Sequence, residues 1–365
     1  MKTRFIKPTK PLNILFLNSS AVFGGTEKWA IMAAEELQRR GHQVYFGYRH
    51  RVIREAAHAA NLPVVHFSLL NDADFVSILK MIRMIRHNNL QLIISTKVKE
   101  YWLGTLAAKL GGCKSLIRLG INRPIVNKWK NRKIFGRWSD AILVNSKPIV
   151  DTLLDAPFIP PHKIHHIYNG VFFPKMLPEF DENPSPFIFS FVGSLIPRKN
   201  VDILIHSFKE LSILHPEHDL RIWIIGDGSE RENLVELTAR LDIAQRVKFW
   251  GHRQDVPKLL SHCHAFVLVS DNEGFPNAAL EAMSYGVPVV LSNIAGAKEI
   301  ITDRQNGLLV EPNNEQVLSG METLLTNSSL RRKLRENARD TLENLFTIDQ
   351  MGNRLEKLLY GLCNG

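Results

Sequence analysis

The chain of 365 residues is 45% hydrophobic and 22% charged, which excludes a disordered, collagen-like or coiled-coil protein and favours two domains of about 150 residues. Its formal net charge of +10 is unevenly distributed: residues 1–170 hold 26 Lys and Arg against 10 Asp and Glu, whereas residues 171–365 hold 20 against 26. The first half is therefore expected to meet an anionic partner, such as a membrane surface, a phosphorylated lipid or a nucleic acid.

The first ten residues hold four cations, Lys2, Arg4, Lys7 and Lys10. The apolar run that follows, at residues 14–17, is shorter than the ~7–15 residues of a secretory signal core. We therefore predict a buried first strand at residues 13–18.

A loop with Gly24 and Gly25 follows this strand, and then a helix at residues 26–40, which Thr26 would cap and Gly41 would end. Apolar runs of strand length then alternate with helical periodicity, which is typical of parallel α/β sheets. Further strands are expected at residues 43–47, 64–67, 92–95, 115–118 and 141–145.

Asn169-Gly170 and the Pro-rich stretch at residues 183–186 interrupt this pattern, and we place a domain boundary after residue 170. Strands are expected in the second half at residues 187–193, 221–225, 247–250, 265–269, 288–291 and 307–310. Helices at residues 313–325 and 330–345 precede a last amphipathic stretch at residues 348–362. Open parallel sheets bind ligands beyond the carboxyl ends of their strands, so two doubly wound domains, 1–170 and 171–347, are expected to face each other across a cleft.

The three cysteines, Cys113, Cys263 and Cys363, are odd in number and form no CxxC pair. They predict neither a disulfide framework nor a structural zinc site, which fits a protein of the reducing cytoplasm. No apolar run reaches the ~18 residues of a membrane-spanning helix, so an integral membrane protein is not expected.

The segment DNEGFPNAALEAMSYG, at residues 271–286, is the strongest candidate site. Its Gly-Phe-Pro-Asn turn places Glu273 at the end of a strand, beside the free N–H groups of a helix that begins near Ala278. Such a terminus favours a diphosphate through its N–H groups and its dipole. Glu281 can present a carboxylate to a hydroxyl pair such as a ribose diol. Two glutamates eight residues apart also occur in ordinary surface helices, but the position after a buried strand favours a site.

Two turns after other strands are further candidates. Gly193 ends a strand and is followed by the adjacent cations Arg198 and Lys199, which would oppose the dipole of the next helix unless an anion lay between them. The turn at residues 225–230, IGDGSE, permits close approach of a ligand at Gly228, although Arg at position 231 leaves the dinucleotide fingerprint incomplete and disfavours a dehydrogenase.

Other signals have ordinary explanations. Asp72-Ala73-Asp74 resembles a metal-binding DxD, but it precedes a helix and is interpreted as its N-cap. The three histidines His162, His165 and His166 share their spacing with no carboxylate or cysteine that would complete a metal site. The stretch NKWKNRKIFGRW, at residues 127–138, mixes cations with aromatic residues, as a membrane interface, a nucleic-acid surface or a half-buried helix would.

Together these segments resemble the family-4 glycosyltransferases, whose α/β fold, GT-B, consists of two Rossmann-like doubly wound domains facing across a cleft. The resemblance covers nearly the whole chain. Its residues are the Gly24-Gly25 loop, Asn145-Ser146, Asn169-Gly170-Val171, FVGSLIPRKN, IIGDGSE, EGFPNAALEAMSYGVPVV and GLLVEPNN.

The resemblance implies a retaining transfer of a sugar from a nucleotide-diphosphate sugar, which is a substrate, with no metal or other cofactor. Glu273 would contact the donor sugar, and Glu281 would bind the ribose. Arg198 and Lys199 would hold the diphosphate and stabilise the leaving group. Further contacts are implied for Gly25, Gly193, Gly228, His252, Phe275, Pro276 and Asn277. The first domain would receive the acceptor and the second the donor, and the helix at residues 348–365 would pack back on the first domain.

Two positions depart from the family pattern. Phe172 stands where an Asp is frequent, and the segment at residues 115–120 carries Arg118 where many members carry a His. We assign Arg118 as a cation on the substrate side. A general base stays unassigned, and a front-face transfer in which the leaving phosphate takes the acceptor proton needs none.

The Arg118-Leu119-Gly120 segment, with Thr96-Lys97 upstream, looks like a bacterial subgroup that builds lipopolysaccharide core or other surface polysaccharides. The expected acceptor is an anionic glycan or a lipid-linked glycan at the inner face of the membrane, with peripheral contact to anionic lipid. A nucleotide-sugar 2-epimerase of the same fold is the alternative enzyme. A basic nucleic-acid-binding protein would leave the segment around Glu273 unexplained, so no nucleic acid partner is expected.

Overall fold

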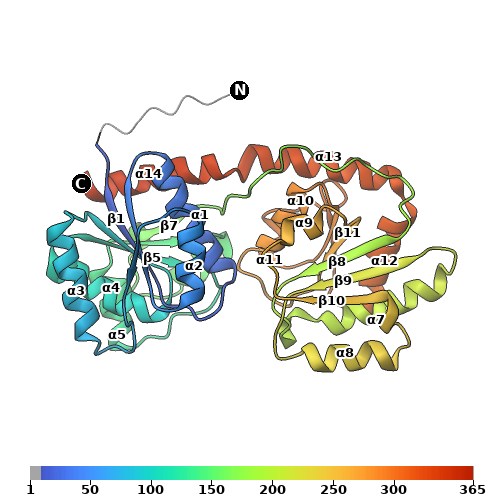
Figure 1. Ribbon diagram of the computed structural model, residues 1–365, viewed down its shortest axis with the longest axis horizontal. Helices are drawn as coiled ribbons and strands as arrows, with labels where there is room; N and C mark the ends of the chain where they lie inside the picture. The colour runs from blue at the N-terminus through green and yellow to red at the C-terminus, as the bar shows by residue number, and fades with distance from the viewer. Residues whose placement is uncertain (1–9, 365) are drawn as a thin grey trace. The chain divides into compact units, whose positions relative to one another are not determined.

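The computed structural model describes residues 10–364 and divides the chain into two compact units (Figure 1). The first unit is formed by the chain up to Gly170 together with the last stretch from Ile348, and the second unit is Val171–Thr347. Both contain a parallel sheet, which confirms the doubly wound α/β class. The positions of Lys2, Arg4 and Lys7 lie outside the described residues.

The first unit contains a seven-stranded parallel sheet in the order β3-β2-β1-β4-β5-β6-β7. Its strands are β1 Asn13–Asn18, β2 Gln43–Tyr48, β3 Val64–His66, β4 Leu92–Ser95, β5 Lys114–Leu119, β6 Ala141–Val144 and β7 Ile164–His166. The sequence predicted the first six. It missed β7 because that strand has only three residues, two of them histidines, and presents no apolar run.

Both faces of this sheet are covered. Along β1, Ile14 and Phe16 pack into one apolar cluster, and Leu15 and Leu17 pack into another. A strand buried on both faces reads as a continuous apolar run, which is why residues 14–17 were recognisable as a strand.

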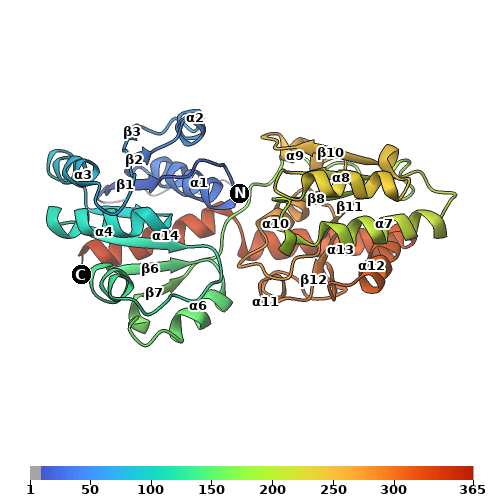
Figure 2. The same ribbon diagram turned by 90° about the horizontal axis from the view of Figure 1, so that it is seen from below.

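Capping contacts mark where helices of the first unit begin. These helices are α1 Gly25–Arg39, α2 Arg51–Ala59, α3 Phe75–His87, α4 Val98–Gly111, α5 Trp129–Asn131, the π-helix η1 Arg132–Trp138, α6 Lys147–Leu154, the 3-10 turn η2 Pro161–Lys163 and α14 Ile348–Asn364. Helices α3 and α4 lie side by side (Figures 1 and 2). The predicted cap Asp74 is confirmed, since its carboxylate accepts the Ser77 N–H at 3.0 Å. The predicted cap Thr26 is wrong: Gly24 caps α1, and Glu27 accepts the Gly24 N–H at 3.0 Å.

The second unit has a six-stranded parallel sheet in the order β10-β9-β8-β11-β12-β13, and all six strands were predicted. Their bounds are β8 Phe187–Val192, β9 Leu220–Ile225, β10 Val247–Gly251, β11 Ala265–Leu268, β12 Val289–Ser292 and β13 Leu308–Val310. The helical segments are η3 Pro197–Lys199, α7 Val201–Leu214, α8 Arg231–Arg240, η4 Ala244–Arg246, α9 Val256–Leu260, α10 Asn277–Ser284, α11 Ala295–Lys298, α12 Asn314–Thr326 and α13 Ser328–Leu345.

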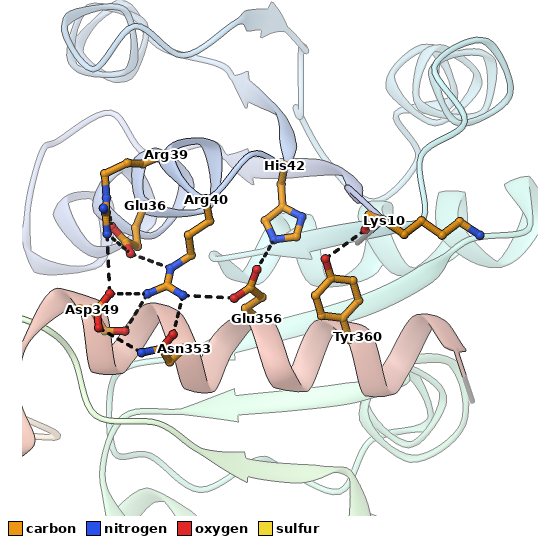
Figure 3. A network of polar contacts seen from close by, with 9 residues as sticks. All are labelled: Lys10, Glu36, Arg39, Arg40, His42, Asp349, Asn353, Glu356 and Tyr360. Atoms are coloured by element: carbon orange, nitrogen blue, oxygen red, sulfur yellow. Dashed lines mark hydrogen bonds and ion pairs between the residues drawn. The ribbon is translucent and has the colours of Figure 1, made fainter. Parts of the chain in front are cut away.

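Helix α14 packs on α1 of the first unit (Figure 3). The buried guanidinium of Arg40, at the end of α1, donates to Glu36 at 2.7 Å, to Asp349 at 2.8 Å and to Glu356 at 3.1 Å. Gly352 allows this approach, because a Cβ there would lie 2.7 Å from Arg40 Nε. The apolar face of α14, with Met351, Leu355 and Leu359, is buried in the same cluster as α1.

We expect Arg40→Ala to lower the free energy of unfolding by about 3 kcal/mol, because the carboxylates around the guanidinium would lose a buried partner. Urea denaturation followed by circular dichroism measures this loss. Arg51→Ala is the control: Arg51 pairs with Glu55 on the surface of α2, and its side chain is 82% exposed. An equal effect of the two substitutions would contradict the central role of Arg40.

Candidate active site

The carboxyl ends of three neighbouring strands in the second unit meet through glycine backbones. The Gly193 N–H, after β8, donates to Ile225 O at 3.0 Å, and the Gly226 N–H, after β9, donates to Gly251 O at 2.9 Å. A Cβ on Gly226 would lie 1.8 Å from Gly193 O, and its φ is +140°. Glycine is therefore required at Gly226 to bring the turns together.

Gly228 has a similar packing role. A Cβ there would lie 2.2 Å from Leu195 O, so the neighbouring turn rather than a ligand already excludes a side chain. Close approach of a ligand at Gly228 and a substrate contact at Gly193 stay predictions.

Glu273 and Lys199 form an ion pair at this edge of the sheet. Lys199 lies in η3 after β8, and Glu273 lies in the loop after β11, so the adjacency of these two strands brings them together. The side chains are 10% and 12% exposed, respectively. Ser270 Oγ also donates to Glu273 Oε1 at 2.8 Å. A nearly buried carboxylate is therefore held by a cation and a hydroxyl.

Arg198 completes this charged group. Its Nη1 lies 3.9 Å from Glu273 Oε2 and donates to Asn272 O at 2.7 Å. The acidic group beside the two cations in this structure is the Glu273 carboxylate, and a ligand anion between them stays a prediction. Both cations lie in η3, and Lys199 directly precedes Asn200, the N-cap of α7, so they stand at a helix start as predicted. Asn200 is in the left-handed conformation, at φ +47°.

The turn after Glu273 leads directly into α10. Pro276 is the N-cap and Asn277 is the first helical residue, so Glu281 lies in the second turn, partly exposed. The Phe275 side chain is buried, with its ring centroid 5.9 Å from that of Phe346. The Phe275 side chain therefore anchors the turn in the core, and the ligand contact implied for Phe275 stays a prediction.

The sequence missed Gly296, which fixes this turn from the other side. It lies in α11, and a Cβ there would be 2.5 Å from Glu273 O and 3.0 Å from Gly274 O. A glycine at this contact lets α11 pack directly on the backbone that carries Glu273. Nothing in the pattern AGAK distinguishes this glycine from one in an ordinary short helix.

His252 follows β10 and is exposed. Within residues 10–364, no hydrogen bond or ion pair joins it to Glu273, so the substrate contact implied for His252 stays a prediction. The adjacent Trp250 ring packs on Trp223, with centroids 5.2 Å apart, and Lys248 Nζ lies 3.8 Å from the Trp250 centroid.

Gly25 and Arg118 belong to the first unit. Gly25 is the exposed first residue of α1. Arg118 is 2% exposed at the end of β5, its guanidinium 4.5 Å from the Trp29 ring centroid and 3.3 Å from Asn169 Oδ1. Burial lowers the pKa of the Arg118 guanidinium to about 10. Its role as a substrate-side cation stays a prediction.

Among the described residues, one group of His, Cys, Asp and Glu has ligand atoms within 4.8 Å of one another: His215, Glu217 and His218, around the end of α7. His215 Nε2 also lies 2.8 Å from Glu322 Oε1. This group includes none of the predicted site residues. Among residues 10–364, no helix is both long and apolar enough to cross a membrane.

Two family models match the chain in succession. The model described as glycosyltransferase family 4 matches residues 23–172, and the model described as glycosyl transferases group 1 matches residues 173–341. The chain is 30% identical over 169 residues to the lipopolysaccharide core biosynthesis glycosyltransferase LpsE of Rhizobium meliloti, an alignment that covers 46% of this chain and 48% of that protein. It thus spans about half the length of this relative.

Longer matches are more distant. The UDP-Gal:alpha-D-GlcNAc-diphosphoundecaprenol alpha-1,3-galactosyltransferase of Escherichia coli is 24% identical over 305 residues, 78% of this chain and 79% of that protein. The crystal structure of Anabaena HepE in complex with UDP-glucose superimposes with a TM-score of 0.81 at 20% identity, covering 96% of this chain and 100% of that one. This likeness shows a common two-domain fold.

We expect Gly296→Ala to lower the melting temperature, because the new methyl group would collide with the Glu273 and Gly274 carbonyl oxygens; overpacking of this kind costs about 1–3 kcal/mol. Gly361→Ala in α14 is the matched control, since a Cβ there meets nothing within 4 Å. Differential scanning calorimetry of both variants checks the contact. A Gly296→Ala protein as stable as the wild type would show that α11 does not fix the turn.

Proposed function

The chain belongs to the family-4 glycosyltransferases of the GT-B fold, whose two domain models together match residues 23–341, and we propose that it transfers a sugar with retention from a nucleotide-diphosphate sugar to a glycan or lipid-linked acceptor of a surface polysaccharide. The observation that carries this proposal is the Lys199–Glu273 ion pair beside Arg198 and the start of α10. It supplies cations and backbone N–H groups for a diphosphate in one place.

The proposed chemistry follows from these groups. Lys199 and Arg198 bind the diphosphate and stabilise the charge that develops on it when the bond from the sugar C1 to the phosphate oxygen breaks. The diphosphate replaces Glu273 as the partner of Lys199. The freed Glu273 carboxylate then accepts hydrogen bonds from the sugar hydroxyls. The acceptor oxygen forms its bond to C1 on the same face, and its proton passes to the leaving phosphate oxygen.

Glu281 is proposed to bind the ribose. Its carboxylate lies on the second turn of α10, one turn beyond the helix start that meets the diphosphate. A carboxylate accepts two hydrogen bonds from a diol, which orients the nucleoside relative to the cations. The structural neighbour HepE supports UDP as the first nucleotide to test, since HepE was crystallised with UDP-glucose.

We expect UDP or another nucleoside diphosphate to raise the melting temperature in the presence of EDTA, and Glu281→Ala to weaken that binding without lowering the melting temperature of the free protein. A ligand at 100 times its Kd stabilises the folded state by about 2.7 kcal/mol. The measurement is a thermal-shift panel of UDP, GDP, ADP, CMP and their sugar conjugates.

Glu236→Ala, which removes an exposed glutamate from α8, is the control for this panel. Stabilisation by no nucleotide would refute the donor site. Product analysis then separates transfer from the alternative of 2-epimerisation, because an epimerase alters the sugar of the donor without any acceptor.

A surface of the first unit supports contact with an anionic membrane. We call it the aromatic–basic surface; it consists of Trp102, Lys109, Trp129, Lys130, Lys133 and Trp138 from α4, α5 and η1. Trp102 packs on Trp129 and Trp138 with centroids 5.9 and 5.3 Å apart. Lys133 Nζ lies 5.3 Å from the Trp129 centroid.

The stretch at residues 127–138 is divided between the core and this surface. Ile134 and Phe135 are buried, whereas Trp129 is 65% exposed, and the nearby start of α3 exposes Phe75 and Val76. Exposed tryptophan among lysines suits the boundary between lipid headgroups and acyl chains. A lipid-linked acceptor would then be met at the surface where it resides.

We expect the protein to bind phosphatidylglycerol vesicles more strongly than phosphatidylcholine vesicles at low salt. Lys133→Glu and Trp129→Ala are each expected to weaken that binding by at least about fivefold, since one lysine near an anionic surface contributes about 1 kcal/mol. Vesicle co-sedimentation measures the binding. Arg54→Glu on α2 is the charge-matched control. Equal binding to both vesicle types, or equal loss in the control, would exclude this surface.

A further inference from the structure

Five neighbouring strands of the first unit carry, on one face of the sheet, a buried polar side chain at or just beyond their carboxyl end. On this face Phe16, Ile94, Leu116, Leu143 and Ile167 pack into one apolar cluster with Trp29 of α1. Side chains alternate between the faces of a strand, so the residue two positions further along each strand lies on the same face. These residues are Asn18, Thr96, Arg118, Asn145 and Asn169, and each is at most 2% exposed.

Only part of this polar row is satisfied. Asn18 Nδ2 donates to Thr96 Oγ1 at 3.0 Å, and Arg118 Nη2 donates to Asn169 Oδ1 at 3.3 Å. Neither side-chain polar atom of Asn145 has a hydrogen-bond partner among the described residues, and the same holds for the hydroxyl of Ser146, the N-cap of α6. Buried polar atoms without partners are costly and therefore uncommon.

Arg118 differs from the other buried arginines. Arg40 is surrounded by carboxylates, and Arg331 Nη1 donates to the carbonyl oxygens of Leu324 and Leu325 at 2.6 and 2.8 Å. Within residues 10–364, Arg118 has one hydrogen bond for its five N–H donors and no carboxylate in ion-pair contact. Arg40 and Arg331 are thus explained by the fold, and Arg118 is not.

The charge of Arg118 is also left without a neutralising acid. Glu27, a carboxylate whose charge acts on Arg118, lies 2.5 Å from Lys97 Nζ and is neutralised there. The guanidinium Cζ lies 4.5 Å from the Trp29 ring centroid, and this cation–π contact uses none of the N–H donors. A planar, buried cation with unused donors matches a phosphate, which accepts two parallel hydrogen bonds.

We propose that Arg118, with Asn145, binds a phosphate group of the acceptor at the carboxyl edge of the first sheet. The guanidinium edge and Asn145 Nδ2 donate to the phosphate oxygens. This assignment rests on the proposed function only in calling the ligand an acceptor; the phosphate site itself does not depend on it. The phosphate belongs either to a phosphorylated glycan or to the lipid carrier.

Gly120 provides a second way to disturb the site. A Cβ on Gly120 would lie 2.1 Å from Arg118 Nη1 and 2.7 Å from Arg118 Cζ, so Gly120→Ala keeps the arginine but displaces its guanidinium. Asn145→Ala separates a ligand role from a structural one. Replacing a buried amide that has no partner by a methyl group leaves the melting temperature unchanged or raises it, whereas it removes a donor to the phosphate.

The test is calorimetric titration of the full chain with inorganic phosphate, together with melting temperatures of each variant. We expect Arg118→Gln, Gly120→Ala and Asn145→Ala each to weaken phosphate binding by about tenfold or more. Arg123→Gln, an exposed arginine on the segment after β5, is expected to bind as the wild type does. Lys199→Met, in the second unit, is expected to retain the phosphate binding that Arg118→Gln loses.

Glucose 6-phosphate and farnesyl phosphate distinguish the two sources of the phosphate by competing with it: the better competitor identifies a glycan phosphate or a lipid phosphate. Phosphate binding that survives in Arg118→Gln, or a wild-type chain that binds no phosphate, would overturn the proposal. An Asn145→Ala variant with a lower melting temperature and unchanged phosphate binding would also overturn the proposal. Failure of every nucleotide to bind would refute the donor site while leaving this outcome unaffected.

Discussion

Both candidate sites depend on the parallel direction of all strands within each sheet. Parallel strands end at the same edge, so the segments that follow them converge there, however far apart they lie in the chain. In the second unit this brings together Lys199 after β8 and Glu273 after β11. In the first it aligns Arg118, Asn145 and Asn169 on one face. These side chains are at most 12% exposed, which strengthens the interactions between them.

Buried cations are accommodated in three different ways, and the difference separates structural from functional roles. Arg40 is held by several carboxylates from α1 and α14, which suits a permanent contact. Lys199 shares one carboxylate with Arg198, and a diphosphate can compete for both cations. Arg118 has a ring and one amide. A cation with fewer acceptors from the protein has more N–H donors left to bind a ligand.

Glycines have two roles at these edges, and sequence alone does not separate them. Gly226, Gly228 and Gly296 are required because backbone lies against their Cα atoms. Gly120 instead leaves room for the guanidinium of Arg118. A glycine in a turn after a strand therefore indicates a close approach, but the tertiary structure decides whether protein or ligand makes it.

The sequence by itself determined the α/β class, nearly all strands, the α3 cap Asp74 and the turn that carries Glu273 into α10, because each depends on neighbours within a few residues. It misplaced the α1 cap and missed β7 and Gly296. The pairing of Lys199 with Glu273, 74 residues later, and the isolation of Arg118 were decided only by tertiary structure. Strand order and burial determine which charges meet, and neither is encoded in local periodicity.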